Sequence, residues 1–121
     1  MYEDILKKLS QSTFRSRFHL TLQDKQYARL KGRNTILQHA RDFVQKRIAP
    51  AVIPNDGKQT PMRGHPVFLA QHATAVCCRG CIQKWHHFQT GHLLTQQEQD
   101  YLVGLIMCWI DQEMNSESRN K

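Results

Sequence analysis

The chain has 121 residues, of which 40% are hydrophobic, so it can build one domain around a single ordinary core. No apolar run approaches the roughly 20 residues that cross a bilayer, and Glu3 and Asp4 stand where a signal peptide is apolar, so we expect no membrane partner. The net charge of +7 is uneven: residues 1–50 hold 11 Lys and Arg against 4 Asp and Glu, whereas residues 95–121 hold 2 against 5. A basic first half favours an anionic partner, with DNA or RNA as the first candidate.

The basic half, residues 1–50, is predicted to be helical. Apolar residues at helical spacing predict a short helix over residues 2–9. Thr21 or Asp24 can cap a second helix that ends near Leu30, before a glycine. A longer amphipathic helix is expected over residues 34–48, where Ala49-Pro50 ends it.

The cations of this half are the candidate nucleic-acid contacts, because Lys and Arg neutralise phosphates. Phe14 and Phe18 alternate with two arginines, and aromatic rings among arginines can stack on bases. The alternative is a solvated cationic face, in which the two rings dock a loop onto the core and the arginines stay in solvent. The candidates are Arg15, Arg17, Arg29, Arg33, Arg41, Lys46 and Arg47.

The second half begins with a loop and ends with a buried helix. Residues 51–66 are rich in proline and in turn residues, and a loop of that length inside a compact domain is often functional. A Cys/His-rich segment follows over residues 66–88, with a helix that starts at a proline. Residues 95–114 begin with a capping box and are apolar nearly all round, which predicts the central buried helix. Residues 115–121 are expected to be a frayed tail.

The prediction for the whole chain is therefore all-α: residues 1–121 form a single small domain of about five helices, with a long Pro/Gly loop and a Cys/His-rich helical junction. No strand alternation and no internal repeat argues otherwise. Three cysteines within five positions, in a chain without a secretion signal, indicate a reducing cytoplasm.

The Cys/His-rich segment is the candidate metal site. Cys78 and Cys81 form a C-x-x-C step, and His86 lies five positions further on. Zinc takes four ligands in a tetrahedron and favours thiolate and imidazole donors. Gly80 is expected to give the tight turn that two thiolates on one metal need. His72 is the first candidate for the fourth ligand, with Cys77 and His65 as alternatives.

Two readings of the same cysteines need no metal. Free cysteine packs as a small hydrophobe, so these thiols can be reduced core residues, and Cys108 in the final helix is expected to be one. Alternatively, the C-x-x-C step is a redox or nucleophilic pair, in which Arg79 and the start of a helix activate Cys78.

Several stretches resemble a family of small bacterial proteins known as domain-of-unknown-function family 4186. The resemblance is carried by residues 55–68, by Gln71-His-Ala-Thr-Ala75, by Cys77-Cys-Arg-Gly-Cys81 and by Lys84-Trp-His86, and it covers most of the chain. It implies no activity, so mechanism rests on the residues themselves. A weaker similarity is to small phage-type HNH nucleases, which also place a C-x-x-C near a histidine, although there the histidine usually follows the cysteine directly.

Three functions follow as hypotheses. The first is a zinc-stapled helical module that binds nucleic acid through its basic half. The second is a one-metal hydrolase or nuclease with His65 or His72 as base, since Asp56 is the only carboxylate between residues 43 and 97 and two-metal chemistry needs several. The third is a metal-free thiol protein with reduced core cysteines.

Overall fold

The structure is a computed structural model that describes residues 1–116, so residues 117–121 of the expected tail lie outside it. It confirms the all-α prediction, and no strand occurs in the described part of the chain. The elements are α1 (Glu3–Ser10), the 3₁₀ turn η1 (Arg15–Arg17), α2 (Leu22–Lys31), α3 (Arg33–Phe43), the π-helical η2 (Val44–Ile48), α4 (Pro66–Ala73), α5 (Arg79–His86) and α6 (Gln96–Asn115).

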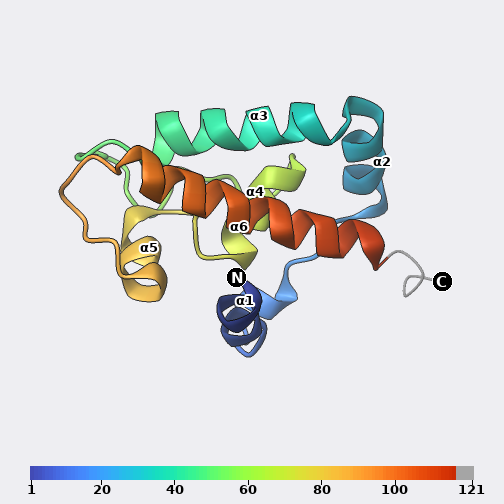
Figure 1. Ribbon diagram of the computed structural model, residues 1–121, viewed down its shortest axis with the longest axis horizontal. Helices are drawn as coiled ribbons and strands as arrows, with labels where there is room; N and C mark the ends of the chain where they lie inside the picture. The colour runs from blue at the N-terminus through green and yellow to red at the C-terminus, as the bar shows by residue number, and fades with distance from the viewer. Residues whose placement is uncertain (117–121) are drawn as a thin grey trace.

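Helix α6 organises the packing. It runs across the whole molecule, with α3 along one side of it and α1 beyond the other (Figure 1). Both α3 and α4 pack against it. Leu102, Leu105 and Ile106 on α6 have no exposed surface, as an apolar helix in the middle of a bundle requires. Within residues 1–116, no helix is both long and apolar enough to cross a membrane.

Local signals place the helix ends. Thr21 and Thr95 each form a capping box, with Asp24 and Glu98 respectively, at the starts of α2 and α6. The expected helix over residues 34–48 is α3 continued by η2, where the hydrogen-bond pattern widens and Ala49 donates to the carbonyl of Val44 at 2.8 Å. Residues 49–65 then run without a helix to the start of α4.

The N-terminal helix docks on α6 through a glycine. The hydroxyl of Tyr2 donates to the carbonyl of Tyr101 at 3.0 Å, and the two rings lie 5.2 Å apart. A Cβ at Gly104 would overlap the hydroxyl of Tyr2, so the absence of a side chain there makes the contact possible.

Gly104→Ala is therefore expected to destabilise the protein by about 1–2 kcal/mol, because the overlap outweighs the better helix propensity of alanine. In a Tyr2→Ala background the same change should be neutral or stabilising, since the obstruction is gone. Urea unfolding of the four proteins measures this reversal of sign. Destabilisation of equal size in both backgrounds would contradict it.

Candidate metal centre

The cysteines follow a tight reversal at the end of α4. Val76 donates to the carbonyl of Gln71 and Ala75 to that of His72, which is the Schellman pattern. Ala75 takes the left-handed position with φ 61°, where glycine is usual, and it is fully buried. This reversal ends α4 before the cysteines, and Cys77 then lies against Arg15 of η1.

Cys78 is the N-cap of α5, and Cys81 lies in the first turn of that helix. The Cys78 sulfur accepts from the backbone N–H of Cys81 at 3.4 Å. Asp56 accepts from the N–H groups of Arg79 and Gly80 at 2.9 and 3.3 Å, so the loop also caps this helix. The expectation of a glycine turn is corrected: Gly80 lies in α5 with no positive φ, because the spacing of the two cysteines comes from a helix start.

The three sulfurs gather on one side of this helix start. The Sγ atoms of Cys77, Cys78 and Cys81 all lie within 4.8 Å of one another, and those of Cys78 and Cys81 are 3.1 Å apart. Sulfurs on a tetrahedral zinc, with Zn–S near 2.3 Å, lie about 3.8 Å apart. Small side-chain rotations would therefore bring all three around one ion. Within residues 1–116, no other group of three or more His, Cys, Asp or Glu side chains brings its ligand atoms this close together.

Arg15 lies against the sulfurs. Its Nη1 donates to the carbonyl of His72 at 2.7 Å and to the Cys77 sulfur at 3.4 Å, and its Nη2 donates to the Cys81 sulfur at 3.1 Å. Only 8% of the residue is exposed. Arg15 was expected on a cationic surface, and the structure corrects this: the residue is buried against the cysteines. Phe18 packs this segment against the core, whereas Phe14 stays exposed, and the sequence does not tell which of the two arginines between them is buried.

The environment makes Cys81 the thiolate of the cluster. Hydrogen bonds from the Cys77 and Cys78 thiols, together with the Arg15 guanidinium, lower the pKa of Cys81 well below its ordinary value. Hydrogen bonds with the other two cysteines, together with burial, raise the pKa of Cys77.

The Arg79 guanidinium does not contact the sulfurs: its Nη1 donates to the carbonyl of Pro50 at 2.9 Å and its Nη2 to that of Gln89 at 2.8 Å. The expectation that Arg79 activates Cys78 is therefore corrected, because the guanidinium is bonded to backbone carbonyls.

The two histidines proposed as ligands are buried beside the cluster and bonded elsewhere. The Nε2 of His72 faces the carbonyls of Thr60 and Pro61 at 3.2 and 3.1 Å. The Nε2 of His86 faces the carbonyl of Thr74 at 2.8 Å. Burial lowers the pKa of both rings, so each is neutral and carries its proton on Nε2. The Nδ1 of His86 is buried without a hydrogen-bond partner. The fourth ligand stays a prediction.

The other candidate donors lie apart from the sulfurs. His65 is the N-cap of α4, where its Nδ1 accepts from Val67 at 3.0 Å. Its Nε2 therefore carries the proton and donates to the Nδ1 of His39 at 2.9 Å. Cys108 is partly exposed on α6 and belongs to no such group.

His65 gives the protein a pH dependence. Burial and the neighbouring His39 lower the pKa of His65 to about 4, below its ordinary 6.5. The folded state thus favours the neutral ring. The contribution of the neutral ring to the free energy of unfolding is fully present above pH 6.5 and is lost as the pH falls towards 4. His65→Asn keeps a capping oxygen without a titrating ring. As the pH falls from 6.5 towards 4, we expect the melting temperature of His65→Asn to fall less than that of the wild type. A difference between the two melting temperatures that stays constant with pH would refute the role of His65.

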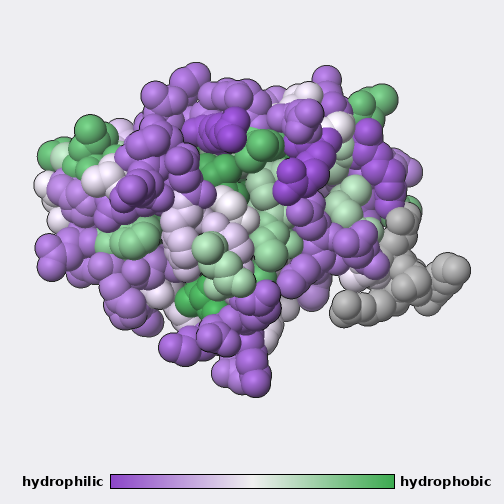
Figure 2. Space-filling view, in the orientation of Figure 1, coloured by the Kyte–Doolittle hydropathy of each residue, from purple (hydrophilic) through white to green (hydrophobic). Residues whose placement is uncertain are grey.

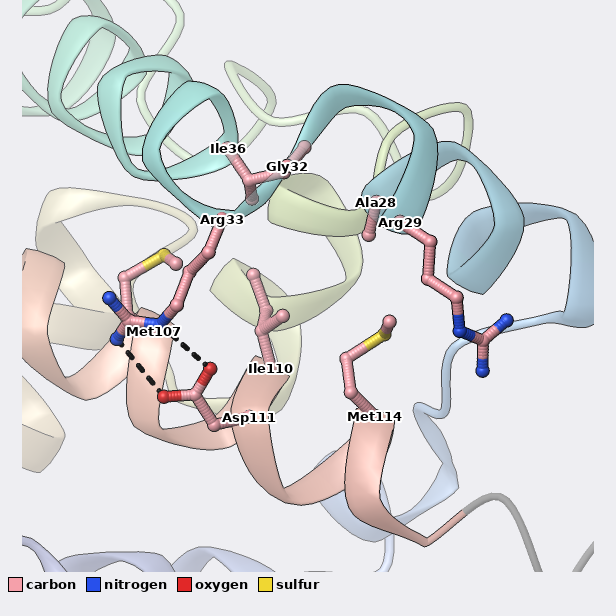
Figure 3. A pocket seen from close by; sticks show the side chains of 9 residues that line it. All are labelled: Ala28, Arg29, Gly32, Arg33, Ile36, Met107, Ile110, Asp111 and Met114. Carbon is pink, nitrogen blue, oxygen red and sulfur yellow. Dashed lines mark hydrogen bonds and ion pairs between the residues drawn. The ribbon is translucent and has the colours of Figure 1, made fainter.

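The cations proposed as nucleic-acid contacts, Arg15 apart, are exposed and come from several elements of the fold. Arg17 is exposed on η1, and Arg29 and Arg33 flank an apolar hollow of about 310 Å³ between α2, α3 and α6 (Figure 3). There Arg33 makes two hydrogen bonds to the carboxylate of Asp111, at 3.1 and 3.0 Å. Arg41, Lys46 and Arg47 are exposed along α3 and η2, and the guanidinium of Arg47 stacks on Phe43 at 5.0 Å.

The fold and the site define a small all-α domain with three clustered cysteines at a helix junction, of which Cys77 and Cys78 are buried and Cys81 is partly exposed. The family model described as domain of unknown function DUF4186 matches residues 3–111, and the chain belongs to that family. No solved structure matches the chain.

Proposed function

We propose that the protein is a zinc-stapled helical module, in which Cys77, Cys78 and Cys81 bind one ion at the α4–α5 junction. The observation that carries this proposal is the convergence of three sulfurs within 4.8 Å around a helix start. Zinc suits the donors, because three soft thiolates favour it over magnesium or calcium, which prefer oxygen ligands. The ion would hold α5 and the loop over residues 49–65 to the end of α4.

A structural role fits better than a hydrolytic one. A hydrolytic zinc needs a bound water and a nearby base. The carboxylate of Asp56 accepts from the N–H groups that begin α5. The imidazoles of His72 and His86 hold backbone carbonyls. These carboxylate and Nε2 atoms thus serve local structure, which favours a staple, and the Nδ1 of His86 is a buried atom left without a partner.

Elemental analysis of the protein purified without a histidine tag tests the proposal. About one zinc per chain is expected, together with a large fall in melting temperature when a chelator removes it. Protein that contains no metal as purified, takes up no added Zn²⁺ and ignores the chelator would identify these residues as packed thiols.

We further propose that DNA or RNA binds along α3 and η2. Hydrophilic residues cover the molecule's edge along α3 (Figure 2). Lys46 and Arg47 line a shallow hollow of about 300 Å³ with Asn55 and Gln59. Two cations beside the Asn55 amide suit a phosphate and its sugar, whereas the Gln59 amide is buried and bonds to Gly57 and Asp56 within the loop. Arg17, Arg29 and Arg33 lie outside this surface and would add long-range attraction only.

Replacing Arg41 and Lys46 with glutamate should weaken binding of a short duplex or single strand by roughly tenfold or more at low salt. It should also reduce the magnitude of the slope of log K against log salt by about two. Lys7→Glu with Lys8→Glu is the matched control, because it changes the charge equally on exposed residues of α1, away from α3 (Figure 1). Fluorescence anisotropy measures both. If the two variants lose affinity equally, only net charge matters and the α3 surface is not a site.

A further inference from the structure

The contact of Arg15 with the cluster joins two parts of the chain that are far apart in sequence. Arg15 lies 62 positions before Cys77 and 66 before Cys81. Three residues later on the same segment, the ring of Phe18 stacks on the His72 ring, with centroids 5.2 Å apart and planes 14° from parallel. The segment between α1 and α2 is thus seated on α4 and the cysteines together.

The charge of a metal-loaded centre explains why a cation belongs there. A divalent ion with three thiolates carries one net negative charge, and an uncompensated charge in a buried site is costly. Arg15 supplies one positive charge and donates to two of the three sulfurs. Hydrogen bonds to coordinating atoms orient ligands and tune the metal, and their loss typically weakens binding.

Few other polar contacts hold this part of the chain. Tyr2 bonds to the backbone of α6, and Glu113 receives hydrogen bonds from the backbone of Leu20 and the ring of His19. Between them, η1 is only three residues long and Phe14 is 43% exposed. Arg15 is thus the buried polar anchor of the segment between α1 and α2.

Resting on the zinc centre proposed above, we infer that Arg15 is the positioning residue of that centre and latches the N-terminal segment, residues 1–20, to the bound metal. Two consequences follow. The arginine strengthens metal binding by neutralising the three-thiolate complex. Conversely, metal loss loosens residues 11–18, because the sulfurs that Arg15 holds lose their fixed arrangement.

The first experiment compares zinc affinities by competition with a chromophoric chelator. Arg15→Gln keeps a hydrogen-bonding group but removes the charge, Arg15→Lys keeps the charge but not the fork, and Arg17→Gln removes an exposed cation from the same turn. We expect Arg15→Gln to bind Zn²⁺ roughly 10- to 100-fold more weakly than the wild type, Arg15→Lys to fall between, and Arg17→Gln to match the wild type.

The second experiment reports on the sulfurs directly. With Co²⁺ in place of zinc, the thiolate-to-metal charge-transfer band should move to lower energy in Arg15→Gln, because the sulfur lone pairs lose a stabilising cation. A role in packing alone would not move this band. Limited proteolysis followed by mass spectrometry should show faster cleavage within residues 11–18 of the wild type once a chelator removes the metal.

The outcomes separate the two proposals. Wild-type protein that binds no zinc overturns the centre and the latch together. Wild-type protein that binds zinc, while Arg15→Gln and Arg17→Gln show equal affinity and the same charge-transfer band, overturns the latch alone. If Arg15→Gln fails to fold, Arg15→Lys and the wild-type proteolysis decide the matter: unchanged affinity with metal-independent cleavage refutes the latch.

Discussion

Cys81→Ser should release the bound metal and lower the melting temperature by about 10 °C or more. A structural zinc contributes on the order of 10 kcal/mol to folding in small domains, and a serine hydroxyl is a poor ligand for it. The sulfur of Cys81 also contacts Cys78 and accepts the shorter of the two Arg15–sulfur hydrogen bonds, so its loss removes that partner from the buried guanidinium. Calorimetry with parallel zinc analysis measures both effects.

Cys108→Ser is the matched control for this substitution. Cys108 is partly exposed on α6 and lies outside the three-sulfur group, so its replacement should leave the zinc content unchanged and cost about 1 kcal/mol or less. The proposed centre fails if Cys81→Ser retains a full equivalent of zinc. It also fails if the two serine variants lose the same amount of stability.

The second large effect is expected at Arg79. This side chain is 3% exposed, and its guanidinium donates to the carbonyls of Ile48, Ala49, Pro50 and Gln89. Those carbonyls belong to the end of η2 and to the chain that follows α5. Arg79→Met keeps most of the volume but removes this donor from all four carbonyls, of which that of Ala49 keeps the hydrogen bond from the backbone N–H of Leu94, so we expect a loss of about 2–4 kcal/mol in the free energy of unfolding.

Lys84→Met on the same helix is the control, since Lys84 is exposed and should change stability by no more than about 0.5 kcal/mol. Urea denaturation measures the difference. Because the Arg79 guanidinium does not contact sulfur, the folded variant should still bind a full equivalent of zinc. Lost metal without lost stability would mean that Arg79 acts on the cysteines after all.

Local interactions explain which parts of the fold could be predicted. Thr21 and Thr95 cap helices through residues three positions away, and Pro66 begins α4 because its ring fits a first helical turn. The apolar run from Tyr101 to Ile110 has no polar face to give to solvent, so α6 had to be central. Each of these signals lies within one stretch of chain, and each was visible without the structure.

The sequence by itself determined an all-α domain and three cysteines close enough along the chain to share an ion. The tertiary structure decided which groups surround them. It brought Arg15 to the sulfurs from more than 60 positions away, and it directed Arg79 to carbonyls. It also placed the Nε2 atoms of His72 and His86 in hydrogen bonds with backbone carbonyl oxygens. The physical reason is that a buried polar group must find a partner, and which partner lies within reach depends on how distant segments pack.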